Sequence, residues 1–439
     1  MELPPDIVPD LSRAELAEAE ELLRNLAGNM PADPHSESEA GPERRSEITP
    51  IEDLAFIPQD PIVSITQSAL EQAFREREPE PTRRAALVRP GRSEFVPVTD
   101  EFIGGQPLTE GETAGAQRRF AGRFQVPTDV RWVSCKIAEA IRFHKQRRPF
   151  VDAPVCRRIG DRVRLVVVGD WGTGIRRARA VGDEMRNVLV EGMDKGLEQH
   201  AVHLGDVYYS GFHYEYRDRF FPNWPVWPEE AEIVGSWSLN GNHDMYSGGY
   251  GYFDTLLADN RFKGHEGCSY FLLENSHWRI VGLDTAWENG GLAGNQAAWL
   301  ENVLAERNGK RTMLLSHHQG LSAYDTLSTD LHARIAPILE RHPCDVWLWG
   351  HEHRCMSFHS TDQIGAGRCI GHGGVPEYQF HRKNVPASAR WEYRGVTRGA
   401  MRLEPWGVFG FAVVELDGAD ATISYINEFG NMHNSPDPL

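Results

Sequence analysis

The chain has 439 residues, of which 40% are hydrophobic, and this composition is ordinary for a globular protein with room for two or three domains. Its 46 basic and 63 acidic side chains give a formal net charge of −17, which argues against a nucleic-acid groove and against binding to anionic lipid. No apolar run reaches the ~20 residues that a membrane span needs. We therefore expect a soluble, cytoplasmic protein that binds no membrane.

The first part of the chain differs in composition from the rest. Residues 1–50 hold 12 acidic and 4 basic side chains, and 13 of the 27 prolines precede residue 101. Low hydrophobicity with high charge predicts an acidic, Pro-rich, largely flexible arm over residues 1–84. One amphipathic helix is predicted within it, between Ser12 and Gly28, from leucines near helical spacing. We leave open whether this helix docks on its own domain, binds a protein partner or frays.

Residues 85–160 are predicted to form a partly ordered N-terminal extension. A second amphipathic pattern runs from Arg131 to His144 and ends in a basic run, which is typical of a solvated helix terminus, with phosphate binding as an alternative. The catalytic domain is predicted over residues 161–430, followed by a C-terminal tail at 431–439.

Buried strands alternate with helical stretches in the predicted catalytic domain, and this pattern is typical of an α/β fold. Six short apolar runs read as strands, at 163–168, 201–204, 233–239, 279–283, 312–315 and 345–349. Most are followed at once by Asp, Asn or His. Because ligands of open α/β sheets collect beyond the carboxyl ends of the strands, these donors predict one shared site.

Five short blocks contain these donors: GDWG at 169–172, GDVYY at 205–209, GNHD at 241–244, SHH at 316–318 and GHEH at 350–353. Together they resemble the signature blocks of the calcineurin-like metallophosphoesterase superfamily, with the purple acid phosphatases as the nearest branch. The resemblance covers roughly residues 161–430. It implies a four-layer α/β/β/α sandwich with a two-metal centre at its mouth.

The resemblance also implies the metal ligands. One metal ion would be held by Asp170, Asp206, Tyr209 and His353, and the other by Asp206, Asn242, His317 and His351. Asp206 would bridge the two ions. Of the two adjacent histidines, His317 is taken as the ligand because the family's ligand directly ends the strand, and His318 is expected to support it.

Gly172 stands where the broad superfamily has a histidine ligand, and a glycine side chain cannot bind a metal. The purple acid phosphatases share this loss and use a tyrosine at the place of Tyr209. A phenolate in place of a neutral imidazole lets Fe(III) replace a divalent ion at unchanged site charge. The expected cofactors are therefore two metal ions, Fe(III) or Fe(II) with Mn(II), Zn(II) or Fe(II). The alternative is that Tyr209 only packs beside Tyr208.

Two metal ions ~3.5–4 Å apart activate water and neutralise a phosphoryl group during in-line displacement. The expected reaction is hydrolysis of phosphate monoesters by attack of a metal-bound hydroxide. A phosphodiesterase on the same site is the alternative, and a catalytically inactive metal-binding regulatory protein is a third reading. His243 is predicted to be the general acid or to stabilise the transition state. Asp244 either orients His243 or caps the following loop.

Two further residues are candidates for contact with a small phosphorylated substrate. Tyr246 opens the aromatic, Gly-rich stretch at 246–252, which suits an organic leaving group or serves as a connector. His372 follows a short apolar run near the fifth block. The six cysteines are scattered without a CxxC pair, so we expect free thiols and neither a zinc ribbon nor a disulfide framework.

Overall fold

The computed structural model describes residues 59–75, 144–377, 385–398 and 405–433, with a few isolated positions outside these ranges. The chain divides into two units, one of residues 1–52 and 58–146, the other of residues 53–57 and 147–439. Apart from single positions, the helices predicted at 12–28 and 131–144 lie outside the described residues. Each unit is therefore considered by itself.

In the first unit, the structure describes one helix and two short strands. They are α2 (Pro61–Arg75), β1 (Phe102–Ile103) and β2 (Gln106–Pro107). Helix α2 begins at Pro61, and the Asp60 carboxylate accepts hydrogen bonds from the backbone N–H groups of Ile62 at 2.9 Å and Val63 at 3.0 Å. This is a standard helix start, because proline suits the first turn and aspartate satisfies its free N–H groups. The sequence analysis did not predict this helix within residues 1–84.

A six-stranded sheet lies on one side of the second unit. Its strand order is β18 (Met432–His433), β17 (Asp420–Asn427), β16 (Gly410–Asp417), β4 (Arg162–Val168), β5 (Glu198–His203) and β6 (Val234–Ser238). Strands β4, β5 and β6 are parallel, and β16 joins them antiparallel along β4. The first three strands predicted from the sequence therefore correspond to β4, β5 and β6.

An eight-stranded sheet faces it. Its order is β13 (Ala389–Glu392), β11 (Cys355–Phe358), β12 (Ile364–Ile370), β10 (Cys344–Trp349), β9 (Arg311–Ser316), β8 (Trp278–Gly282), β7 (Phe271–Glu274) and β3 (Val155–Arg158). Strands β8, β9, β10 and β12 are parallel, and three of them match the other predicted strands. A separate hairpin pairs β14 (Val396–Arg398) with β15 (Pro405–Gly407).

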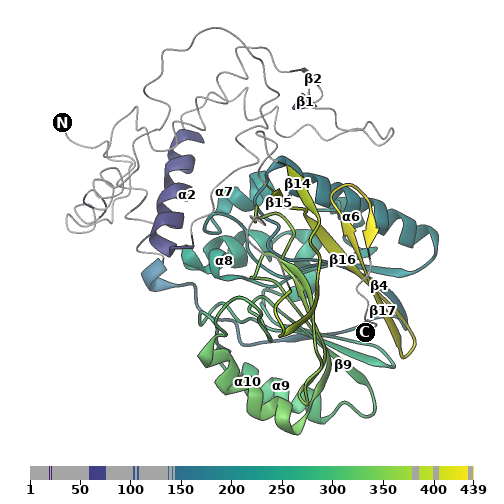
Figure 1. Cartoon of the computed structure of the whole chain (residues 1–439). Coiled ribbons are helices and arrows are strands. Elements are labelled where there is room, and N and C mark those ends of the chain that lie inside the picture. The colour runs from purple at the N-terminus through teal and green to yellow at the C-terminus, as the bar shows by residue number, and fades with distance from the viewer. Residues whose placement is uncertain are drawn as a thin grey trace, which may run out of the picture. The chain divides into compact units, whose positions relative to one another are not determined.

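Helices cover the outer faces of both sheets (Figure 1). Helix α6 (Arg176–Asp194) contacts β4 and β5, whereas α9 (Gln296–Ala305) and α10 (Thr329–Arg341) share a core with the eight-stranded sheet. Side chains from both sheets, such as Leu165 and Leu348, form the central core. Burial of each such side chain contributes ~1.5–3 kcal/mol. The predicted four-layer α/β/β/α sandwich is confirmed.

Short helical turns lie between β5 and β6 and between β6 and β7, the strand at which the chain passes into the eight-stranded sheet. They are α7 (His213–Glu215), η2 (Tyr216–Phe220), η3 (Pro228–Glu230), α8 (Asn242–Tyr246), η4 (Tyr252–Leu256) and η5 (Asn260–His265). Two strands fall outside the predicted limits of the catalytic domain: β3 precedes residue 161, and β18 lies in the predicted tail. Both are short edge strands, which lack the long apolar runs that mark central strands.

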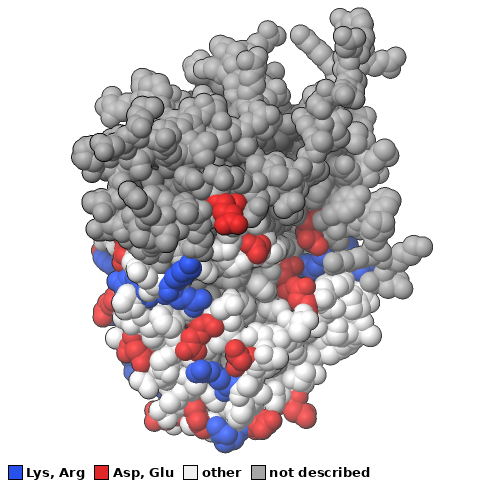
Figure 2. Space-filling model, turned by 90° about the vertical axis from the view of Figure 1, so that its left-hand side faces the viewer, with Lys and Arg blue, Asp and Glu red and all other residues white. Residues whose placement is uncertain are grey.

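Acidic and basic side chains are interspersed with uncharged residues over the described part of the face in Figure 2. Mixed charge of this kind keeps the field at any one place dependent on nearby groups rather than on the net charge. None of the helices in the described ranges combines the length and apolar character that a membrane crossing requires.

Candidate metal centre

The candidate centre is built from loops that follow five strands. Asp170 follows β4, Asp206 follows β5, Asn242 follows β6, His317 follows β9, and His351 and His353 follow β10. Contacts between these side chains show that all five strand ends meet at one place. The convergence on which the predicted site depends is therefore present.

Four of these residues have a left-handed backbone, with φ of 56° at Asp170, 77° at Asp206, 71° at His351 and 49° at His353. This conformation costs a residue other than glycine ~1–3 kcal/mol, and such strain gathers at functional sites. Hydrogen bonds hold the strained turns. For example, the Asp170 carboxylate accepts from the His351 N–H at 2.7 Å.

One group of donor atoms comprises Asn242, His317 and His351. The His317 Nε2 atom lies 2.9 Å from Asn242 Oδ1 and 3.1 Å from His351 Nδ1, and the last two atoms are 3.1 Å apart. His317 donates its Nδ1 proton to the Leu204 carbonyl at 3.0 Å, so in the neutral ring Nε2 carries a lone pair. Lone pairs crowded at ~3 Å are spaced like neighbouring ligands of a metal ion with bonds of ~2.1 Å.

A second group surrounds Asp170. Its Oδ1 atom lies 3.5 Å from His353 Nε2 and accepts a hydrogen bond of 3.2 Å from the Tyr208 hydroxyl. The same hydroxyl donates to Asp206 Oδ2 at 3.1 Å and lies 3.4 Å from His353 Nε2. These atoms form a second cluster of metal-ligand type.

Asp206 belongs to both groups. Its Oδ2 atom, which contacts Tyr208, also lies 3.5 Å from His317 Nε2 in the first group. Its Oδ1 atom accepts from the His243 N–H at 2.9 Å, which fixes the carboxylate. Asp206 thus stands between two donor groups, in the position predicted for a bridging ligand.

The electrostatics of the centre fit cations. Asp170 and Asp206 are almost fully buried, and burial and the charge of Asp206 hold the pKa of Asp170 well above its usual range. Burial also lowers the pKa of His317 and His351, and it lowers that of His353 to about 3, so these rings stay neutral. Two buried carboxylates beside neutral imidazoles need a positive charge to be stable, and bound metal ions supply it.

The hydroxyl position that the resemblance assigns to Tyr209 is taken in the structure by Tyr208. The Tyr209 ring lies under the Arg219 guanidinium, 5.0 Å from its centroid, and the Tyr209 N–H donates to Glu215 at 2.5 Å. Tyr208 and Tyr209 lie in a turn, and the backbone path of this turn decides which ring faces the carboxylates. In the structure, the Tyr208 hydroxyl lies beside the carboxylates of Asp170 and Asp206.

The absence of a histidine at Gly172 has a steric reason. The loops of Asp170 and Asp206 pair directly here, since the Gly172 carbonyl accepts from the Tyr208 N–H at 3.2 Å. A Cβ atom on Gly172 would lie 2.7 Å from the Cα of Val207, which is closer than side-chain carbons approach a backbone. Only glycine fits this crossing, and the crossing brings Tyr208 to the centre.

His243 is oriented by a backbone carbonyl. Its Nδ1 atom donates to the Tyr209 carbonyl oxygen at 2.7 Å, and its ring lies between the rings of Tyr208 and Tyr246. Within the described residues, the buried Nε2 atom has no hydrogen-bond partner. A fixed ring with one free nitrogen beside the Asp206 carboxylate is suited to proton transfer.

Asp244 caps the loop of Asp206, which precedes it in the chain, rather than the following loop. Its carboxylate accepts from the N–H groups of Asp206 at 2.8 Å, Val207 at 3.1 Å and Gly241 at 2.7 Å. Burial and the charge of Asp206 raise the pKa of Asp244 to about 7. The orienting role expected for it toward His243 is taken by the Tyr209 carbonyl.

Supporting residues that the sequence analysis did not predict hold the loop around Tyr208. Glu215 is fully buried and accepts from the N–H of Ser210 at 3.2 Å and of Phe212 at 2.8 Å. Arg219 donates to the Tyr208 carbonyl. In the sequence, Glu215 and Arg219 appear only as a charged pair four residues apart just after the second block, and such pairs are typical of many surface helices.

His318, which was expected to support the ligand His317, forms a hydrogen bond of 2.9 Å between its Nδ1 atom and Thr285 Oγ1, and its ring lies beside the His351 ring.

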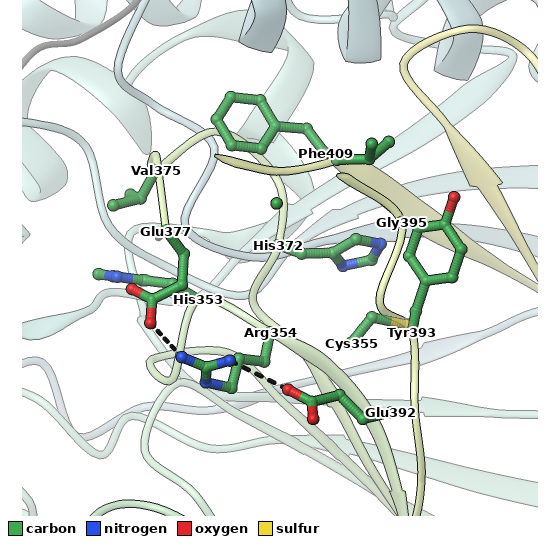
Figure 3. A pocket seen from close by; sticks show the side chains of 12 residues that line it. His353, Arg354, Cys355, His372, Val375, Glu377, Glu392, Tyr393, Gly395 and Phe409 are labelled. Atoms are coloured by element: carbon green, nitrogen blue, oxygen red, sulfur yellow. Dashed lines mark hydrogen bonds and ion pairs between the residues drawn. The ribbon is translucent and has the colours of Figure 1, made fainter. Parts of the chain in front are cut away.

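Tyr246, predicted to contact substrate, contacts a predicted ligand. Its hydroxyl accepts from Asn242 Nδ2 at 2.7 Å, which turns Asn242 Oδ1 toward His317 and His351. His372 lies in a neighbouring cleft that His353 also lines (Figure 3). The two predicted substrate contacts thus lie on different sides of the centre.

We expect Tyr246→Phe to weaken metal binding by about 10–100-fold, because partners that orient a ligand typically contribute this much. The variant removes the hydroxyl that fixes the Asn242 amide and keeps the ring beside His243. Titration of the metal-free protein with Mn(II) measures the change in affinity. Affinity equal to wild type would show that Asn242 needs no such support. Tyr250→Phe, in the same glycine-rich stretch, is the control.

Part of the chain is similar to a known family of proteins. Residues 163–355 match the family model of calcineurin-like phosphoesterases. No curated protein matches the chain. Among solved structures, the chain is similar to GAP50, the anchor in the inner membrane complex of Plasmodium, at 14% identity and a TM-score of 0.45, over 62% of this chain and 88% of that one.

A dimetal phosphatase and a 5'-nucleotidase are similar to the chain at comparable sequence identity and TM-score. A dimetal phosphatase from Danio rerio shares 13% identity at a TM-score of 0.39, over 60% of this chain and 95% of that one. A 5'-nucleotidase from Candida albicans shares 12% at 0.34, over 64% and 54%. The family assignment rests on the family model, whose match contains every donor residue of both groups. Residues 163–355 are thus the part of this chain that is similar to calcineurin-like phosphoesterases.

Proposed function

We propose that the chain is a dinuclear metal-dependent phosphomonoesterase of the purple acid phosphatase type. The observation that carries the proposal is the position of Asp206, whose Oδ2 atom contacts both the Tyr208 hydroxyl and His317 Nε2. A carboxylate shared by two groups of ligand atoms is what a pair of metal ions requires. When bound, two cations supply an activated water and neutralise the phosphoryl charge.

Two sets of residues would hold the cations. Asp170, Tyr208 and His353 form one set, and Asn242, His317 and His351 form the other, with Asp206 common to both. Carboxylate, phenolate and imidazole ligands suit iron, manganese and zinc. A phenolate in the first set favours Fe(III) there, with Fe(II), Mn(II) or Zn(II) in the second.

The protein's own proton donor is His243. In its protonated form, the Nε2–H group donates to the oxygen of the leaving alcohol, while the Tyr209 carbonyl continues to accept from Nδ1. The backbone N–H of His243 holds Asp206, so the proton donor and the bridging carboxylate are positioned by the same residue. The group that protonates the leaving alcohol therefore lies beside the ligand that would bridge the metal ions.

The depth of the centre supports monoesters over diesters. Asp170, Asp206, His243 and His317 are buried to 99% or more, and Asn242 to 94%. A terminal phosphate projects from its alcohol and reaches a deep site, whereas the phosphorus of a diester carries a substituent on both sides. The substrates we propose are therefore small phosphate monoesters.

Parallel assays with an aryl monophosphate and a bis-aryl phosphate test this function. The full chain is first freed of metal and then reconstituted with iron, manganese or zinc. We expect metal-dependent hydrolysis with a higher kcat/KM for the monoester. A higher value for the diester would favour the phosphodiesterase alternative. A protein that binds two metal ions and hydrolyses neither compound would favour a regulatory role.

Spectroscopy distinguishes the two tyrosines. If the centre takes up Fe(III), we expect a visible tyrosinate-to-iron absorption band that Tyr208→Phe abolishes and Tyr209→Phe retains, because the Tyr208 hydroxyl contacts Asp170 and Asp206. The measurement is the absorption spectrum of each iron-loaded variant. Loss of the band in Tyr209→Phe alone would show that Tyr209 is the ligand, as the resemblance implies.

A further inference from the structure

A second group of potential metal ligands lies outside the dinuclear centre. Cys355 on β11, His372 after β12 and His433 on β18 each present one ligand atom, and these atoms lie within 4.8 Å of one another. They come from three segments far apart in the sequence. Cys355 and His372 are 98% and 96% buried, and His433 is partly buried at the edge of its sheet.

The His372 ring is buried without hydrogen bonds to the described residues. Within the described residues, neither of its ring nitrogens makes a hydrogen bond, although both are buried. Burying an imidazole without a hydrogen-bond partner is unfavourable, so the position of the His372 ring points to a ligand that it binds. Figure 3 shows the ring extending across the cleft toward the side of Cys355 and Tyr393.

The surroundings fix the other two ligands. The His433 ring stacks on Tyr393 with centroids 3.6 Å apart, and on Tyr425 at 5.6 Å. Cys355 carries a free thiol, and its carbonyl accepts from the Tyr393 N–H at 2.9 Å, which ties the strand of the thiol to the residue that stacks on His433.

We propose that Cys355, His372 and His433 bind one Zn(II) ion. A thiolate with two imidazoles is a ligand set for zinc, which takes four ligands in a tetrahedron. Bonds of ~2.3 Å to sulfur and ~2.0–2.1 Å to nitrogen place the ligand atoms about 3.5 Å apart, which is compatible with their lying within 4.8 Å of one another in the structure. Zn(II) displaces the thiol proton, and water takes the fourth position.

This site is separate from the dinuclear centre and does not depend on the proposed hydrolase activity. The ligands of the two sites differ in one way that can be measured. No cysteine stands among the carboxylate, amide, phenol and imidazole groups of the dinuclear centre. A signal from a metal–thiolate bond therefore cannot come from the dinuclear centre, even in the fully loaded protein.

Cobalt(II) is the probe, because it takes the place of zinc and gives a near-ultraviolet thiolate-to-cobalt charge-transfer band. The metal-free full chain is titrated with Co(II), and its zinc content is measured after reconstitution with Zn(II). We expect a band that saturates at about one equivalent, and about one zinc ion fewer per chain in Cys355→Ser than in wild type. Cys344→Ser, which removes another buried thiol, is the matched control and keeps the band.

His433→Ala tests the same site. His433 is half-buried on an edge strand, so the loss of its side chain should disturb the fold little. We expect a weakened or absent cobalt–thiolate band in this variant, with the dinuclear metals retained. A wild-type protein without the band overturns the proposal. A band that persists at full strength in Cys355→Ser or His433→Ala also overturns it.

Discussion

Asp206→Asn is expected to abolish binding of the metal pair and to lower turnover by about three orders of magnitude or more. The carboxylate is the one group that contacts both sets of ligand atoms, through Tyr208 and His317. An amide has the same shape but donates at one of its two positions and carries no charge. Because the cations supply several kcal/mol of transition-state stabilisation and each 1.4 kcal/mol is a factor of ten in rate, the loss is large.

Metal content per chain and kcat/KM on an aryl monophosphate measure this effect. Asp417→Asn changes an exposed acid that lies 3.7 Å from Arg162, and this control should behave as wild type. A variant that keeps both metal ions and more than about a tenth of the activity would show that Asp206 is not the bridge.

Once metal is removed, Asp206→Asn should not lower the stability of the protein. In the chelated protein, the charges of Asp206 and Asp170 face each other in a buried place, and this repulsion contributes to the raised pKa of Asp170. A neutral amide removes the repulsion. Chelated Asp206→Asn should therefore unfold at a temperature no lower than chelated wild type, which also shows that loss of activity is not loss of fold.

His243→Ala is expected to lower kcat by about 10²–10⁴-fold while both metal ions stay bound. The imidazole contributes no ligand atom: Nδ1 is held by the Tyr209 carbonyl, and Nε2 is free within the described part of the chain. The backbone N–H that holds Asp206 is unchanged by the substitution. The measurement pairs metal analysis with kcat.

Leaving-group chemistry makes this prediction specific. A general acid matters most when the leaving alcohol is a weak acid, so the loss should be larger for an alkyl phosphate than for a nitrophenyl phosphate. Equal losses on both would assign His243 to electrostatic stabilisation instead. His359→Ala, which removes an exposed histidine, is the control. Unchanged kcat in His243→Ala would remove this residue from the reaction.

The parts of the site that follow from regular structure could be predicted from the sequence. Buried runs such as 163–168 and 345–349 become central strands because only a sheet covered on both faces accommodates them. The donors after such runs converge because parallel strands end at one edge. Hence Asp170, Asp206, Asn242, His317, His351 and His353 meet as expected.

The parts that depend on loop conformation could not be predicted. Tyr208 and Tyr209 are adjacent and chemically identical, and the close crossing at Gly172 decides which one faces the carboxylates. Asp244 is adjacent to His243 in the sequence, whereas Tyr209 lies 34 residues away, and only the backbone path shows that the Tyr209 carbonyl is the group that reaches the imidazole.

The second group of ligands was hidden for a different reason. Cys355, His372 and His433 follow no short spacing motif, and His433 lies in a segment that reads as a tail. They meet because β18 pairs at the edge of β17 and because β11 and β12 are antiparallel neighbours. Long-range pairing of this kind leaves no local pattern in a single sequence.

Anomalous diffraction from crystals of the manganese- or zinc-loaded full chain tests the dinuclear centre most directly. We predict two peaks about 3.5–4 Å apart, one on either side of the Asp206 carboxylate, with Asp170 and His353 at one peak and Asn242, His317 and His351 at the other. A single peak at this place, or two peaks that do not share Asp206, would contradict the account.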